Sequence, residues 1–155
     1  MIRYVVDASV AVKWFLDERD SDVARLLLED DPRPHFFAPY EILAPAILPI
    51  EVRYVLGKQF NKGAISLEML VMSLSIMRKI FGSFAPIDDD LLEKASALSF
   101  RLSDGPITHL DNVPTFGIYD CLYIALALQC DAELVTADRK QAELAQHHDV
   151  TTRLI

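Results

Sequence analysis

Cysteine, glycine, tryptophan and long apolar runs are all scarce in this chain of 155 residues. The two cysteines, Cys121 and Cys130, are too few for a disulfide framework or a cysteine-rich zinc site, and we expect them to be reduced thiols. No apolar run approaches the ~20 residues that a membrane-spanning helix needs. The first residues lead directly into a strand-like run, without the pattern of a signal peptide. We therefore expect a cytoplasmic protein with no membrane partner.

Basic residues are also scarce, since 15 Lys and Arg face 23 Asp and Glu, for a formal net charge of −8. This balance argues against a protein that holds nucleic acid through a general excess of positive charge. If the ligand is a nucleic acid, bound metal or a local group of Lys and Arg must provide much of the phosphate binding. An acidic chain also favours a basic protein partner.

The chain does contain a large apolar fraction, 52%, distributed over alternating strand-like and helix-like segments. Its length fits one domain, residues 1–155, with room for a substantial core. The alternation is typical of an α/β domain with a mostly parallel sheet. Strands are predicted at residues 2–6, 41–44, 84–87, 133–136 and 151–155. Helices are predicted at residues 8–28 with a break near 17–22, and at 45–60, 66–80, 88–102, 118–129 and 139–146, with a long loop over 103–115.

Four acidic residues stand at the edges of apolar runs, where a fold normally avoids charge. Asp7 and Asp138 each follow a predicted strand, Glu51 interrupts an apolar helix, and Asp120 opens the most apolar helix. The carboxyl ends of parallel strands share one edge of a sheet, where ligands bind. Gathering several carboxylates there is costly unless a cation neutralises them. The pattern therefore predicts a site for Mg²⁺ or Mn²⁺, which prefer oxygen ligands.

Helix capping and two other kinds of acidic site are alternatives to a divalent-metal site at these positions. Asp7, Asp120 and Asp138 are each placed to cap a helix, whereas Glu51 lies within one and has no capping role. A haloacid-dehalogenase-type phosphatase also begins with a strand that ends in Asp, but it needs a second Asp two positions later, where this chain has Ser9. A response-regulator receiver needs an acidic pair at the end of the first strand, and Asp7 has no acidic neighbour.

Four sequence blocks carry a likeness to a known family. They are VVDASV at residues 5–10, PAILPIEV at 45–52, YDCLYIALA at 119–127 and LVTADR at 134–139. With these blocks in this order, the chain resembles a PIN-domain ribonuclease, and most closely a VapC-like toxin of a type II toxin–antitoxin system. The resemblance implies a PIN-like three-layer α/β/α sandwich with a central, mostly parallel sheet. It also implies a homodimer and a small cognate antitoxin that blocks the site.

The resemblance assigns catalytic and metal-binding roles to the four acids and implies a hydrolytic reaction. Asp7 and Asp120 are the expected direct ligands of Mg²⁺ or Mn²⁺, and Glu51 and Asp138 complete the set. Water would attack an RNA phosphodiester bond, leaving a 5′-phosphate and a 3′-hydroxyl, with a metal that lowers the pKa of the water. The family's small hydroxyl residues correspond to Ser9 and Thr136. These two residues, together with Lys13 and Arg139, are the predicted substrate-binding residues.

Two departures from the family pattern concern substrate fit. Many relatives have Asn three residues after the glutamate, where this chain has Tyr54, and the 103–115 loop is longer than usual.

Two alternative functions stay open at this point. One is a PIN-fold module that binds RNA without turnover, and the other is a metal-dependent DNA or flap nuclease. Neither the target RNA nor the cleavage sequence follows from the residues.

Overall fold

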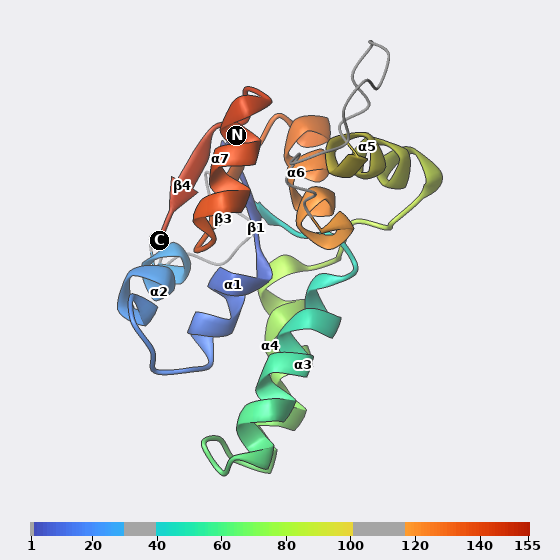
Figure 1. The fold of residues 1–155 in the computed structure, drawn as a ribbon. Coiled ribbons are helices and arrows are strands. Elements are labelled where there is room, and N and C mark those ends of the chain that lie inside the picture. Colours follow the sequence, from blue (N-terminus) through green and yellow to red (C-terminus); the bar gives the residue numbers. More distant parts are fainter. Residues whose placement is uncertain (1, 30–39, 101–116) are drawn as a thin grey trace, which may run out of the picture.

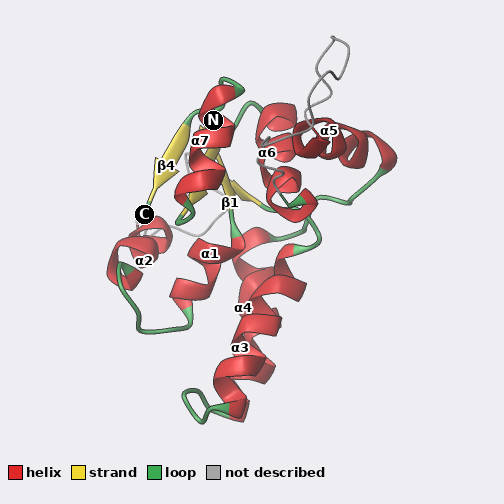
Figure 2. Cartoon of the chain, viewed as in Figure 1, coloured by secondary structure: helices red, strands yellow, loops and turns green. Residues whose placement is uncertain are grey.

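The computed structural model describes residues 2–29, 40–100 and 117–155, and these contain one parallel sheet. Its strands are β1 (Ile2–Val6), β2 (Tyr40–Leu43), β3 (Glu133–Thr136) and β4 (Thr152–Leu154). Their order is β2-β1-β3-β4, and each neighbouring pair is parallel. Figure 2 shows the strands in yellow and the helices in red. The predicted α/β class with a mostly parallel sheet is therefore confirmed.

Helices cover the sheet and extend beyond it (Figure 1). They are α1 (Ala8–Ala11), the 3₁₀ turn η1 (Val12–Trp14), α2 (Ser21–Glu29), α3 (Leu48–Asn61), α4 (Leu67–Phe81), α5 (Asp89–Phe100), α6 (Ile118–Cys130) and α7 (Arg139–His147). Helix α6 packs on β1 and β3 and is covered by α5, while α7 packs on β3 and β4. Helices α3 and α4 form a hairpin that projects away from the sheet. The predicted α/β/α sandwich is confirmed, and none of the helices in the described ranges is long and apolar enough to span a membrane.

Burial in the core explains why the central segments form parallel strands and an apolar helix. Val5 and Val6 of β1 and Leu134 and Val135 of β3 are fully buried, as expected for central parallel strands with both faces covered. Each such aliphatic side chain contributes about 1.5–3 kcal/mol to folding. Helix α6 is buried continuously from residue 121 to residue 127, so it is apolar on all sides and lies at the centre.

Most predicted boundaries agree with the structure to within a few residues. The 8–28 segment is interrupted as expected, and Asp20 adopts a positive φ of 62° in the break. Helix α3 begins at Leu48 rather than residue 45, with Pro49 in its first turn. The predicted 103–115 loop and the last two residues of the predicted 88–102 helix lie outside the described residues.

The strand predicted at residues 84–87 is wrong. Only one parallel bridge forms there, between Pro45 and Ala85. The Ala85 N–H donates to the Ala44 carbonyl at 2.9 Å, and the Ala46 N–H donates to the Ala85 carbonyl at 2.8 Å. Further pairing would need the Leu48 N–H, but this group donates to the Pro45 carbonyl at 3.0 Å as the chain turns into α3, so the pairing stops after one residue.

Candidate active site

The candidate active site lies at the carboxyl ends of β1 and β3. From β1 the chain continues to β2 on one side, whereas β3 pairs on the other side of β1. This reversal is a topological switch point, the usual ligand position in an open parallel sheet. The backbone N–H of Asp7 donates to the Val135 carbonyl at 3.0 Å, which joins the two strand ends directly. Asp7, Thr136 and Asp138 are thereby brought to one edge, as the sequence predicts.

Asp7 is the most buried of the four acids, with 6% of its surface exposed. Its Oδ2 accepts hydrogen bonds from the Ser9 N–H at 3.1 Å, the Ser9 hydroxyl at 2.5 Å and the Thr136 hydroxyl at 3.3 Å. These donors favour the ionised form, but burial outweighs them and raises the pKa of Asp7. A buried carboxylate held in this way suits a nearby cation, which would offset the burial.

Ser9 and Thr136 also connect the two turns that follow the strands. The Ala137 N–H donates to the Ser9 hydroxyl oxygen at 2.9 Å, and the Asp138 N–H donates to the Thr136 hydroxyl oxygen at 3.0 Å. Thr136 is fully buried, and Ser9 is partly exposed. Both hydroxyls therefore orient Asp7, and their predicted contact with substrate stays a prediction.

Glu51 reaches the same region from helix α3. Its Oε2 accepts a hydrogen bond of 2.5 Å from the hydroxyl of Tyr123, a fully buried residue of α6. Burial raises the pKa of Glu51, and the negative charges of Asp7 and Asp120 raise it further, although the Tyr123 bond acts in the opposite direction. Glu51 therefore belongs electrostatically to the same group of acids.

Asp120 and Asp138 complete this acidic group. Burial, and to a smaller extent the charges of Asp7 and Asp138, raise the pKa of Asp120 to about 6. Asp138 is exposed and caps α7, accepting from the N–H groups of Lys140 at 2.8 Å and Gln141 at 3.2 Å. The capping alternative thus describes Asp138 and also Asp7, which caps α1. It does not describe Asp120, because Gly117 is the cap of α6.

The acidic group has the chemistry expected of a site for a hard cation, without forming a closed cage. In the described ranges, no three Asp, Glu, His or Cys side chains converge closely enough to hold a metal ion by themselves. The acids nevertheless interact: after burial, the charge of Asp7 raises the pKa of both Glu51 and Asp120, Asp120 also raises that of Glu51, and Asp138 that of Asp120. An open set of carboxylates fits Mg²⁺, which usually keeps several waters and takes one or two carboxylates plus substrate phosphates.

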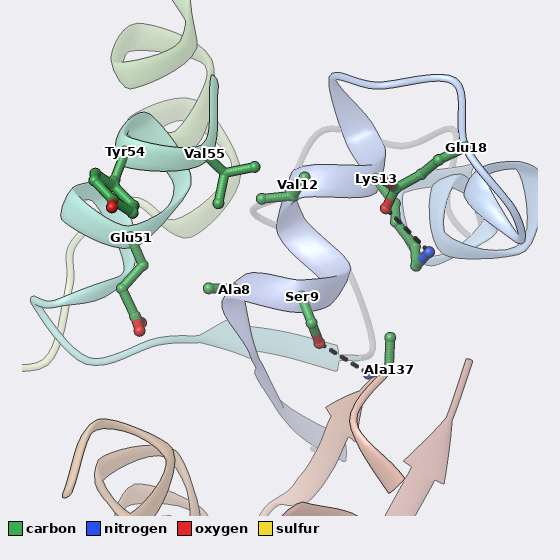
Figure 3. A pocket seen from close by; sticks show the side chains of 9 residues that line it. All are labelled: Ala8, Ser9, Val12, Lys13, Glu18, Glu51, Tyr54, Val55 and Ala137. Carbon is green, nitrogen blue, oxygen red and sulfur yellow. Dashed lines mark hydrogen bonds and ion pairs between the residues drawn. The ribbon is translucent and has the colours of Figure 1, made fainter. Parts of the chain in front are cut away.

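A cleft of about 430 Å³ opens beside these acids, between α1 and α3 (Figure 3). Glu51 and Tyr54 line it from α3, and Ser9 lines it from α1. Lys13 also lines it, but its Nζ is bonded to Glu18 Oε1 at 3.1 Å and to the Arg19 carbonyl at 2.6 Å. The remaining lining residues are Ala8, Val12, Glu18, Val55 and Ala137. The cleft is therefore largely apolar, with acidic groups at its edges.

Two polar contacts of the site do not follow from the sequence pattern. The first is the hydroxyl of Tyr123, for which the apolar surroundings predict core packing. The second is Gln141, whose Nε2 lies 3.5 Å from Asp7 Oδ1 and 3.1 Å from the Asp120 carbonyl oxygen. A usable signal for Gln141 is a polar residue on a helix face that otherwise carries Ala142 and Ala145.

Comparison with known proteins gives one matching family. Residues 4–146 match the family model described as the PIN domain. A comparison with curated proteins gives no match.

Several solved structures share the fold at low sequence identity. A chain of VapBC2 from Rickettsia felis, bound to a promoter DNA fragment, is 14% identical with a TM-score of 0.65, over 99% of each chain. VapC20 from Mycobacterium tuberculosis, described as a toxin that cleaves the sarcin–ricin loop, is 13% identical with a TM-score of 0.65, over 90% of this chain and 93% of that one. VapBC-5 from Mycobacterium tuberculosis, of the VapBC family of toxin–antitoxin systems, is 16% identical with a TM-score of 0.56, over 100% of both chains.

Proposed function

Because the chain belongs to the PIN domain family, we propose that it is a metal-dependent endoribonuclease and the toxin of a toxin–antitoxin pair. The observation that carries this proposal is the group of four carboxylates at the switch point of the sheet. Asp7 is buried there, and burial together with neighbouring negative charges raises the pKa of Asp120 and Glu51. Such a group is unfavourable by itself and becomes favourable with a divalent cation. Its predicted cofactor is Mg²⁺ or Mn²⁺.

Each acid has a defined role in the proposal. Asp7 and Asp120 hold the cation directly, because Asp7 is the most buried of the four acids and its charge adds to burial in raising the pKa of Asp120. Glu51 and Asp138 complete the site from α3 and from the end of β3. When bound, the cation provides Lewis acidity toward the scissile phosphate and lowers the pKa of an attacking water. The hydrogen bonds from Ser9 and Thr136 keep the Asp7 carboxylate in one orientation throughout.

RNA is the proposed substrate, and individual basic side chains near the metal site are proposed to contact its phosphates. VapC20, which shares the fold, is described as cleaving the sarcin–ricin loop, an RNA element. Arg139 stands at the start of α7, directly after Asp138, and is exposed. We assign it a contact with a backbone phosphate next to the metal site. Lys13 is assigned a weaker role, because Glu18 already neutralises its ammonium group.

The proposed protein partners are a cognate antitoxin and a second copy of the chain. VapBC complexes are among the proteins that share this fold. The net charge of −8 favours an antitoxin with a basic segment. The α3–α4 hairpin also exposes large apolar side chains, which are typical of protein interfaces. They include Ile50, Leu67, Val71 and Met72.

The experiment is RNA cleavage by the purified chain with Mg²⁺, with Mn²⁺ and with EDTA. Asp7→Asn preserves the shape of the side chain and removes its charge, so we expect it to abolish cleavage and to retain the fold by circular dichroism. Glu93→Gln removes one charge from an exposed position of α5 and serves as the matched control. It should cleave as the unchanged protein does.

Three outcomes contradict the proposal in different ways. Full activity of Asp7→Asn rules out the assigned site. RNA that is held but never shortened identifies a binding module without turnover. Cleavage of DNA or flap substrates, with RNA left intact, identifies a different nuclease on the same fold.

A further inference from the structure

Gln141 contacts three of the four acidic residues, although it carries no charge itself. It lies in the first turn of α7 and is 1% exposed. Its Nε2 donates to the Asp120 backbone carbonyl at 3.1 Å and, over a longer distance of 3.5 Å, to Asp7 Oδ1. Its backbone N–H donates to Asp138 Oδ1 at 3.2 Å. One buried side chain therefore links β1, α6 and α7 where the acids meet.

The surroundings of Gln141 determine which way its amide points. Both groups near Nε2, a carboxylate and a carbonyl, are acceptors only, so the NH₂ end of the amide must face them. The other end, Oε1, is buried, and no donor in the described part of the chain reaches it. A buried acceptor without a partner opposes folding. The acids thus hold Gln141 in an orientation that is unfavourable for its own carbonyl oxygen.

An apolar side chain would fill this position without that penalty. The neighbouring inward positions of α7 are apolar, with Ala142, Leu144 and Ala145 all buried. Packing alone therefore does not explain an amide here. The contacts with Asp7 and Asp120 do explain it, because Ser9 and Thr136 engage only Oδ2 of Asp7, whereas Gln141 reaches Oδ1.

We propose that Gln141 is a positioning residue, which orients the acidic ligands of the divalent cation. Its amide fixes the Asp7 carboxylate relative to the first turn of α6, so that Asp7 and Asp120 present their oxygens to the same ion. This inference rests on the proposed function, since it requires the acids to be cation ligands. Hydrogen bonds from neighbouring groups to ligating carboxylates typically change metal affinity roughly 10- to 100-fold. Because the bond to Asp7 is long, we expect an effect near the lower end of that range.

The test compares metal binding with stability in RNA-free protein. Gln141→Met keeps the length of the side chain and removes the amide, and Gln141→Leu is a second, differently shaped variant. Gln146→Met is the matched control on the same helix, where the exposed amide bonds to Thr152 instead. Binding of Mn²⁺ is measured by calorimetry and by electron paramagnetic resonance, and thermal unfolding is measured in EDTA and in Mn²⁺.

We expect both Gln141 variants to unfold in EDTA at the same temperature as the unchanged protein or higher, because the unpartnered oxygen is gone. They should bind Mn²⁺ about tenfold more weakly and gain less thermal stability from it, while Gln146→Met should bind as before. Unchanged Mn²⁺ affinity in both Gln141 variants overturns the inference, as does a parallel loss of affinity and of EDTA stability. If the unchanged protein binds no Mn²⁺, the proposed metal site itself is wrong, which is a separate result.

Discussion

The hydroxyl of Tyr123 lies 2.5 Å from Oε2 of Glu51 and donates a hydrogen bond to it. This bond joins the central helix α6 to the projecting helix α3. Burial and the surrounding carboxylates raise the pKa of Tyr123, so its hydroxyl keeps its proton and stays a donor. The Glu51 carboxylate is thereby fixed at the edge of the cleft, even though burial raises its own pKa.

Replacing Tyr123 with Phe removes the hydroxyl that donates to Glu51 and keeps the aromatic ring, so this variant tests the hydrogen bond alone. We expect the free energy of unfolding to fall by about 1 kcal/mol, the net contribution of a typical hydrogen bond. Cleavage should fall roughly tenfold, because a carboxylate of the metal site loses its orienting donor. Urea unfolding and the rate of Mg²⁺-dependent RNA cleavage measure the two effects.

Tyr119→Phe is the control for this change, since Tyr119 lies on the same helix and is 56% exposed. It should alter neither quantity. If Tyr123→Phe loses stability but cleaves RNA at the original rate, Glu51 does not depend on this bond for its role.

Replacing Arg139 and replacing Lys13 should have different effects, although both residues are predicted to contact phosphate. Lys13 is 9% exposed and ion-paired with Glu18, whereas Arg139 is exposed next to Asp138. Arg139→Gln should weaken RNA binding and reduce the slope of log affinity against log salt concentration by about one. Lys13→Met should instead reduce thermal stability, because it removes the Glu18 pair and the bond to the Arg19 carbonyl.

Lys62→Gln removes one positive charge at the C-cap of α3, in the connection to α4, and should leave the salt slope unchanged. RNA affinity is measured in EDTA by fluorescence anisotropy at several salt concentrations. A normal salt slope for Arg139→Gln, together with a reduced slope for Lys13→Met, would reverse the two assignments.

The strand ends at the candidate site could be predicted because the signal for each lies within a few consecutive residues. Buried parallel strands are apolar runs, and the runs of β1 and β3 each lead to an acid, so Asp7 and Asp138 identify one edge of the sheet. The same pattern fails at residues 84–87, where the apolar residues suggest a strand but the partner segment turns into α3 after Ala46, so only one bridge forms there. Strand pairing also requires a partner segment that stays extended, and the side chains of residues 84–87 do not encode that.

The fine structure of the site could not be predicted, because it depends on contacts between distant segments. The sequence around Tyr123 indicates a core residue, and its hydroxyl gains a role only because Glu51 of α3 lies within hydrogen-bond distance. Gln141 gains its contacts only where α7 returns to β1 and α6. Such contacts are set by tertiary packing, which neither periodicity nor spacing encodes.

Tyr54 should influence how RNA binds rather than how it is cut. It occupies the position where many relatives have Asn, lines the cleft next to Glu51, and is 64% exposed. The ammonium of Lys58 lies 4.1 Å from the centre of its ring. Stacking of a base on an aromatic ring contributes about 1–3 kcal/mol. Tyr54→Ala should therefore raise KM for RNA roughly tenfold with little change in kcat, and Tyr54→Phe should retain the original KM.

Steady-state kinetics with one short RNA substrate measure both constants. A loss of kcat in Tyr54→Phe would indicate that the hydroxyl, and not the ring, is the important group. Equal KM values for Tyr54→Ala and the unchanged protein would remove Tyr54 from the substrate site.

The stability of the metal-free protein should decrease as pH rises through the range in which Asp120 ionises. The pKa of Asp120 is about 6 in the folded protein and 3.8 for an unperturbed Asp, so the folded state binds more protons between these values. Stability therefore falls as pH increases from about 4 to about 6. Asp7 and Glu51 have raised pKa values and act in the same direction. Bound Mg²⁺ or Mn²⁺ should restore stability above pH 6, since it prefers the ionised carboxylates.

Thermal unfolding from pH 4 to pH 8, in EDTA and in Mn²⁺, measures this dependence. Asp120→Asn should unfold at a higher temperature than the unchanged protein at pH 7.5 in EDTA, because it removes one of the repelling charges. It should also gain less from Mn²⁺, because it removes a ligand. Glu93→Gln, with its exposed side chain on α5, should follow the unchanged protein in both conditions. If Asp120→Asn lowers the unfolding temperature in EDTA at pH 7.5, the carboxylate is stabilised in the folded state, and repulsion among the four acids is not what the cation relieves.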